Sequence, residues 1–215
     1  MLHGTSGMEG IAQRKSTSRY WDARFKRYVV KLLPGEYYVG NGDEMIVTVL
    51  GSCIAACIYE RVLSIGGMNH FMLPSRKFPT RDHDDSVTNY NSLASRYGNV
   101  AMERLINEII KKGGKRCNLE VKIFGGARIT NSSTDIGAGN IAFVREYLEL
   151  EGITVVNEDV GGSLPRKVFY IPSSNDVFVK KIEKTDYGKI IAKEKDYQST
   201  LKDEEVKGKV FFLDD

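Results

Sequence analysis

"VTVLGSCIAACIYE" (residues 47–60) and "SIGGMNHFML" (residues 64–73) decide how this chain folds. Both stretches are short and largely apolar, and residues 60–63 lie between the two predicted strands. This pattern predicts two antiparallel strands joined by a four-residue loop. The first strand begins at Cys53, directly after Gly51-Ser52, and the second strand contains His70.

The predicted hairpin brings Cys53 and His70 together. A loop over residues 60–63 pairs Tyr59 with Ser64, and this register sets Cys53 opposite His70, with Cβ atoms about 4.5–5.5 Å apart. A thiolate is a nucleophile, and a neighbouring histidine can generate it and later protonate a leaving group. The backbone N–H groups of Gly51 and Ser52 could stabilise an oxyanion. The pair is therefore either catalytic or a packing contact in the core.

The remaining cysteines and histidines favour structural roles. Three cysteines, at positions 53, 57 and 117, are an odd number in a chain long enough to fold without disulfides. No second Cys/His pair lies at zinc-finger spacing, and a metal site at residues 83–85 is disfavoured. Cys57 and Cys117 are expected to be structural, and we expect neither metal nor cofactor.

The composition is that of a globular protein. Of the 215 residues, 41% are hydrophobic and 27% charged, with a formal net charge of +3. No long block of like charge and no basic run interleaved with aromatics is present, which argues against nucleic-acid binding. The apolar runs are too short to cross a bilayer, and the first residues lack the apolar region of a signal peptide. We expect a cytoplasmic protein without membrane insertion.

The chain divides into three predicted parts: a flexible leader at 1–19, a domain at 20–184 and a charged, peripheral extension at 185–215. Within the domain, short strands broken at Pro34-Gly35 and Asn41-Gly42 precede the hairpin. After it we expect a long loop (75–98), a helix (99–112), a strand (119–126), a helix (136–152), a strand (153–162) and a hairpin (167–182). This order predicts a mixed-sheet α/β sandwich with flanking helices.

Two double glycines end predicted strands, at 125–126 and 161–162. Each indicates either a tight turn or a place where a substrate segment passes close to the backbone. The expected inward residues of the two helices are Val100, Leu105, Ile109, Ile110, Ile141, Val144, Leu148 and Leu150.

Six segments in order resemble the chemoreceptor glutamine deamidase family, CheD. They are "LGSCIAACIYE", "IGGMNHFMLP", "VKIFGGA", "IGAGN", "EDVGG" and "PRKVFYIP", and they span roughly Tyr37 to Val179. The resemblance implies that Cys53 attacks the side-chain amide of a receptor glutamine, releasing ammonia and leaving a thioester. It implies that His70 acts first as base and then as acid, before water yields glutamate.

The resemblance also implies a third catalytic residue. The family has a threonine, commonly six positions before the cysteine; here Val47 stands at that position and Thr48 stands five positions before Cys53. Neighbouring strand residues face opposite sides unless a bulge intervenes. Thr48 is the predicted orienter of His70, and Ser52 is the alternative.

The family further implies a fold resembling that of deamidating-toxin cysteine hydrolases. The implied partners are chemoreceptor cytoplasmic domains and a CheC-type phosphatase. Two other functions remain open from the residues alone: a non-catalytic regulator that binds such a phosphatase, and a cysteine protease using the same Cys–His chemistry.

Overall fold

The computed structural model describes residues 14–16, 18–40, 42–73, 93–129, 135–183 and 187–207. In chain order the strands are β1 (Arg14–Lys15), β2 (Arg19–Asp22), β3 (Arg27–Lys31), β4 (Glu36–Gly40), β5 (Met45–Leu50), β6 (Ile54–Glu60), β7 (Ile65–His70), β8 (Leu119–Gly125), β9 (Thr154–Val160), β10 (Arg166–Ile171) and β11 (Asp176–Lys181). The α-helices are α1 (Leu93–Lys111), α2 (Ile136–Leu150) and α3 (Tyr187–Lys207).

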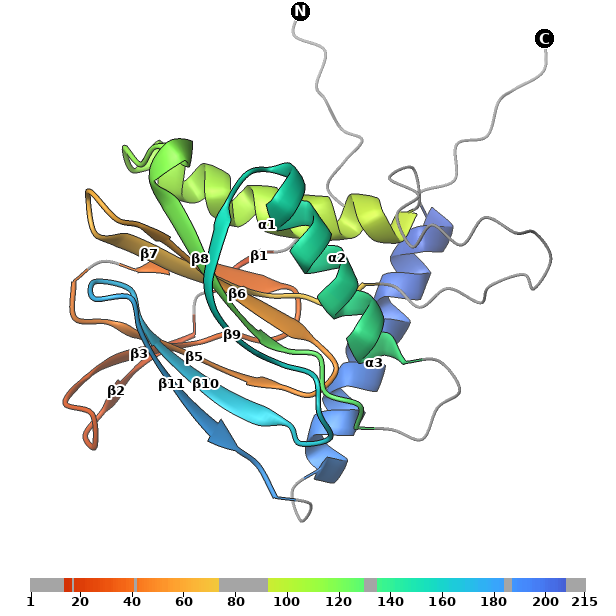
Figure 1. The fold of residues 1–215 in the computed structure, drawn as a ribbon. Coiled ribbons are helices and arrows are strands. Elements are labelled where there is room, and N and C mark those ends of the chain that lie inside the picture. Colours follow the sequence, from red (N-terminus) through yellow and green to blue (C-terminus); the bar gives the residue numbers. More distant parts are fainter. Residues whose placement is uncertain are drawn as a thin grey trace, which may run out of the picture.

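The strands form two mixed sheets that pack face to face. The six-stranded sheet has the order β1-β4-β7-β6-β8-β9, and the five-stranded sheet has the order β11-β10-β5-β3-β2 (Figure 1). The pairs β1/β4, β8/β9 and β3/β5 are parallel, and the other pairs are antiparallel. The expected α/β architecture with mixed sheets is confirmed at this level.

Two apolar layers hold the sheets and helices together. Between the sheets lie side chains such as Ile46, Leu50, Met68 and Tyr170. The other face of the six-stranded sheet packs against α1 and α2 through a second core that includes Leu105 and other residues of both helices. Alternating strand residues supply both layers, because successive side chains point to opposite faces.

The chain crosses from one sheet to the other at residues 51–53. Strand β5 ends at Leu50 in the five-stranded sheet, and β6 begins at Ile54 in the six-stranded sheet. Thr48 lies on the side of β5 that faces the other sheet, whereas Val47 packs on the outer side with Val29 and Met45. The crossing therefore puts Cys53 at the edge of the layer between the sheets.

The strands from β3 to β11 match the expected segments, but the helices differ in detail. The first helix begins at Leu93, six residues before the expected start, so the loop expected at 75–98 is partly helical; residues 74–92 lie outside the described part. Ile110 and Leu150, expected to point inward, are 36% and 61% exposed. Ile110 directly follows the buried Ile109, and a rotation of about 100° per residue turns its side chain to solvent. Leu150 is the last residue of α2, two positions beyond the buried Leu148.

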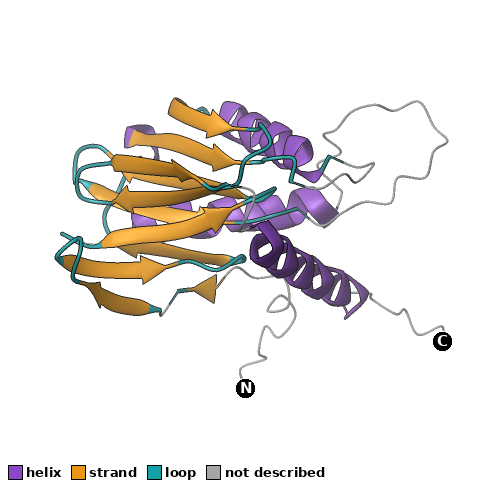
Figure 2. Cartoon of the chain, turned by 90° about the horizontal axis from the view of Figure 1, so that it is seen from below, coloured by secondary structure: helices purple, strands orange, loops and turns teal. Residues whose placement is uncertain are grey.

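Both ends of the chain depart from expectation. Part of the expected leader is structured, because β1 pairs with β4 and the buried Ser16 donates a hydrogen bond to Lys31 O. The extension forms α3, which crosses one end of both sheets, on the right in Figure 1 and at the strand ends in Figure 2. It is not peripheral, because its Glu194 side chain is buried against the chain crossing. None of the helices in the described ranges has the length and apolar character needed to cross a bilayer.

Candidate active site

The predicted register of the Cys53–His70 hairpin is wrong by two residues. Glu60 pairs with Ile65 and the Ile54–Phe71 bridge continues the same register, which sets His70 opposite Ala55 and not opposite Cys53. The loop is again four residues long but covers residues 61–64. The Glu60 carboxylate accepts hydrogen bonds from the backbone N–H groups of residues 62 and 63, which keeps Glu60 as the last strand residue.

A shift of two residues keeps the side chains on their predicted face, because strand side chains alternate with a period of two. Cys53 and His70 therefore point into the same layer between the sheets, as diagonal neighbours on adjacent strands. Such neighbours lie roughly 7–8 Å apart at Cα, which long and aromatic side chains can span. The observed register therefore puts both residues of the predicted pair on the same face of the sheet, one diagonal step apart.

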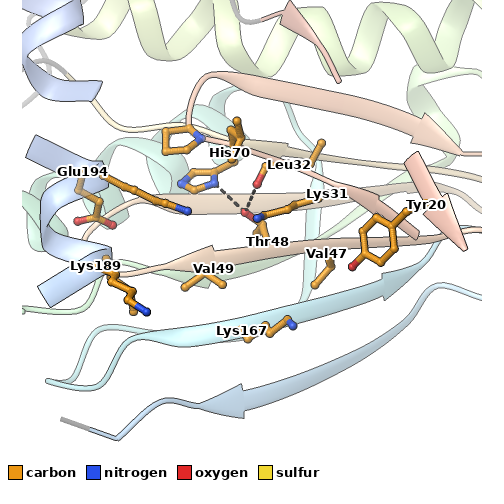
Figure 3. A pocket seen from close by; sticks show the side chains of 14 residues that line it. Tyr20, Lys31, Leu32, Val47, Thr48, Val49, His70, Lys167, Lys189 and Glu194 are labelled. Carbon is orange, nitrogen blue, oxygen red and sulfur yellow. Dashed lines mark hydrogen bonds between the residues drawn. The ribbon is translucent and has the colours of Figure 1, made fainter. Parts of the chain in front are cut away.

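Thr48 reaches His70 from the opposite sheet. Its Oγ1 lies 2.7 Å from His70 Nδ1 and 3.0 Å from Leu32 O, and both side chains are buried (Figure 3). A hydroxyl has one proton, and a carbonyl oxygen can only accept. When Thr48 donates to Leu32 O, its oxygen accepts from His70 Nδ1–H, which leaves Nε2 as the basic nitrogen of the ring. Ser52, the alternative, makes its hydroxyl bonds elsewhere, to Glu194 and Met72.

The buried setting disfavours charge on both predicted catalytic groups. Burial lowers the pKa of His70 from an ordinary 6.5 to about 3. Burial, followed by the charge of Glu194 and a hydrogen bond with it, raises the pKa of the Cys53 thiol well above its ordinary range. In this state the proton stays on sulfur and the imidazole stays neutral.

The backbone of Cys53 packs closely against the first double glycine, Gly125-Gly126. Gly126 N donates to Cys53 O at 2.8 Å, and a Cβ on Gly125 would lie 2.1 Å from that same oxygen. Gly125 has a φ of 114°, in the left-handed region that favours glycine. Gly161 N in turn donates to Gly125 O. Both double glycines therefore serve close backbone packing, the tight-turn alternative.

Glu194 of α3 lies directly on the crossing. Its two carboxylate oxygens accept hydrogen bonds from three successive backbone N–H groups, at 2.9 Å from Gly51 N, 3.1 Å from Ser52 N and 3.3 Å from Cys53 N. The Ser52 hydroxyl donates to the same carboxylate at 2.6 Å. Gly51 permits this approach, because a Cβ there would lie 2.8 Å from Glu194 Oε1. Converging N–H groups of this kind bind anions.

Asn140 of α2 holds the crossing from the other side. Its Nδ2 donates to Ser52 O at 2.8 Å, and its Oδ1 accepts from Leu73 N at 2.9 Å. Sequence reasoning assigned no role to Asn140 or to Glu194. The signal for Asn140 is its place in the quoted "IGAGN" segment. The signal for Glu194 is its helical spacing from Ile190 and Tyr197.

The other cysteines are not part of this arrangement. Cys57 is buried on the face that Cys53 shares, and burial raises the pKa of its thiol. Cys117 is exposed after α1. Among the described residues no group of three or more His, Cys, Asp and Glu side chains is arranged to hold a metal ion; residues 83–85 lie outside that part.

Comparison with known proteins gives consistent matches. Residues 72–181 match the family model described as CheD chemotactic sensory transduction. A probable chemoreceptor glutamine deamidase CheD of Halorhodospira halophila is 45% identical over 194 residues, covering 90% of this chain and 88% of the relative. The protein of the same name from Methylobacillus flagellatus is 45% identical over 202 residues, covering 93% and 97%. The one from Hahella chejuensis is 45% identical over 196 residues, covering 91% and 90%.

Proposed function

This chain belongs to the CheD family, and we propose that, like the relatives named for this activity, it converts glutamine side chains of chemoreceptors to glutamate. The activity is that of a protein-glutamine glutaminase acting on linear amides. The Thr48–His70 hydrogen bond is the main support for placing this activity at Cys53 and His70. It orients the imidazole within the layer between the sheets, where Cys53 also lies.

The first half of the proposed reaction forms a thioester. The Cys53 thiol gives its proton to His70 Nε2, and the sulfur attacks the side-chain amide carbon of the substrate glutamine. The carbonyl oxygen becomes an oxyanion that the backbone N–H groups of residues 51–53 can stabilise, because they already bind a carboxylate in this structure. His70 then protonates the departing nitrogen, which leaves as ammonia.

The second half regenerates the enzyme. His70 removes a proton from water, the hydroxide attacks the thioester carbon, and the C–S bond breaks to give the glutamate carboxylate and the Cys53 thiol. Thr48 acts as a positioning residue throughout: it accepts from Nδ1–H, which leaves Nε2 to take the thiol proton, and it stabilises the imidazolium that forms in each half.

Three further features of the proposal rest on family membership and on the resemblance of the quoted segments. We infer a CheC-type phosphatase as a second partner, a cytoplasmic location, and kinship of the two-sheet sandwich with deamidating-toxin cysteine hydrolases. A pull-down with purified CheC-type phosphatase tests the partner. Absence of binding at micromolar concentrations of both proteins would remove it.

The activity itself is tested by mass spectrometry. A chemoreceptor cytoplasmic domain is incubated with the full-length protein and then analysed by intact mass and peptide mapping. We expect specific glutamines to be converted to glutamate by the wild type and not by Cys53→Ala. A cysteine protease would instead cleave the receptor backbone, and a purely binding protein would leave the receptor unmodified.

A further inference from the structure

The buried carboxylate of Glu194 has the chemistry of the proposed reaction product. Glutamate and glutamine side chains have the same length and differ only in one terminal atom group. Glu194 presents this carboxylate from a helix to the three N–H groups of residues 51–53, and its charge and hydrogen bond act directly on Cys53. A glutamate carboxylate is therefore already bound by the N–H groups that the proposed reaction assigns to the oxyanion.

Helix α3 contacts the rest of the described structure through one narrow stripe of side chains. Its inward face is a stripe at positions 190, 194, 197 and 201, and most of its other described side chains are exposed. At its start Tyr187 Oη donates to Ser163 O at 3.1 Å. Further along, the hydroxyl of Tyr197 hydrogen-bonds with that of Tyr97 on α1, and its ring covers Gly35. Between these contacts, the Glu194 carboxylate anchors α3 by accepting hydrogen bonds from the backbone of residues 51–53.

The surface under α3 has more room than α3 fills. On one side of Glu194 a cavity of about 250 Å³ reaches Thr48 and His70 (Figure 3). On the other side a cavity of about 340 Å³ extends past Ser52 to Ile136 at the start of α2. A helix with larger inward side chains beside its central residue would fill both spaces. Hollows therefore lie on both sides of Glu194 along the inward face of α3.

We propose that α3 is an internal product mimic, with Glu194 in the place of the reacting side chain, and that the substrate segment displaces α3 and binds as a helix on the same surface. This inference rests on the proposed deamidase function and adds the conformation and docking site of the substrate. In the closed state Glu194 blocks the oxyanion site, and the high thiol pKa and low imidazole pKa keep the catalytic pair uncharged. Displacement of α3 removes the block and opens the pair to substrate.

The first test makes the mimic a substrate. In Glu194→Gln the side chain at position 194 should be deamidated by Cys53 of the same chain: amide plus water gives carboxylate plus ammonium through the thioester. Peptide mapping of the purified full-length variant should find glutamate at position 194. In the double variant Cys53→Ala/Glu194→Gln the amide should persist, which controls for spontaneous deamidation.

The second test uses receptor kinetics. Removal of the anchor in Glu194→Ala should lower KM for the receptor cytoplasmic domain about tenfold and leave kcat unchanged, because a self-competitor reduces only the fraction of binding-competent enzyme. Alkylation of Cys53 should also accelerate about tenfold. Asp196→Ala, which removes an exposed carboxylate from the same helix, is the matched control and should behave as wild type.

The outcomes separate this inference from the proposed function. If the wild type modifies receptors but the amide at position 194 persists in Glu194→Gln, Glu194 does not occupy the place of the reacting side chain. If Glu194→Ala lowers kcat or leaves KM unchanged, α3 is a structural brace and the inference is overturned. If neither receptors nor position 194 are converted by any Cys53-containing form, the deamidase assignment itself fails.

Discussion

The hydroxyl of Thr48 should contribute to catalysis and its methyl group only to stability. Thr48→Val preserves side-chain volume and removes the hydroxyl, whereas Thr48→Ser preserves the hydroxyl and removes the methyl group. In the first variant His70 Nδ1 and Leu32 O lose the partner that now lies 2.7 and 3.0 Å away. The pair of variants therefore separates orientation of the imidazole from packing.

The magnitude follows from the charge that His70 carries during proton transfer. A hydrogen bond to a charged group contributes about 1.5–3 kcal/mol. Loss of that amount from the transition state lowers kcat roughly 10- to 150-fold. Thr48→Ser should keep kcat within about threefold of the wild type, while losing about 0.5–1.5 kcal/mol of stability for one buried methyl group.

The assay is receptor deamidation at saturating substrate, at a temperature where thermal melting shows every variant to be folded. Because Thr48→Val also leaves buried polar groups without their present partner, its melting temperature should fall as well. The comparison that decides is kcat, measured on folded protein. Equal kcat for Thr48→Val and Thr48→Ser would refute a positioning role for the hydroxyl.

Three further predictions concern the catalytic pair, the buried imidazole of His70 and the hydroxyl of Ser16. Cys53→Ala and His70→Ala should each abolish deamidation, and the double variant should lose no more of kcat than either single variant. Cys57→Ser should keep most of kcat. If the two single losses in kcat multiply in the double variant, the pair does not act as a unit. The free energy of unfolding of the wild type should fall as the pH drops from the ordinary histidine pKa of 6.5 toward 3, because the unfolded state binds the His70 proton first. The fall should exceed that of His70→Gln by up to about 4–5 kcal/mol. If the unfolding free energies of the two proteins, measured in urea, change in parallel over this pH range, the pKa of His70 is not lowered. Ser16→Ala should cost about 1 kcal/mol in urea unfolding, because Ser16 donates a buried hydrogen bond to the β3 backbone. The exposed Ser18→Ala should cost less than about 0.5 kcal/mol. Equal effects would show that the buried hydrogen bond of Ser16 adds no stability.

The hairpin around residues 61–64 shows how far sequence pattern reaches. Alternation of apolar residues predicted both strands and the face that each side chain occupies. It did not predict the register, because the turn is set by the Glu60 carboxylate bonding backbone N–H groups beyond it, and this detail moved the pairing by two residues. Since a shift of two residues restores the same face, Cys53 and His70 lie on the same side of the sheet despite the error.

Local periodicity and residues close together in the chain were enough to predict the strands, their faces, the family resemblance and the candidate pair. Which residues approach that pair from elsewhere depends on how the sheets and helices pack. Thr48 faces His70 because β5 lies in the opposite sheet with that side turned inward. Glu194 meets the crossing across 143 positions of sequence, from a helix whose polar composition predicted a peripheral tail. Contacts of this kind arise from the packing of whole elements, and a local pattern contains no information about which distant element will cover it.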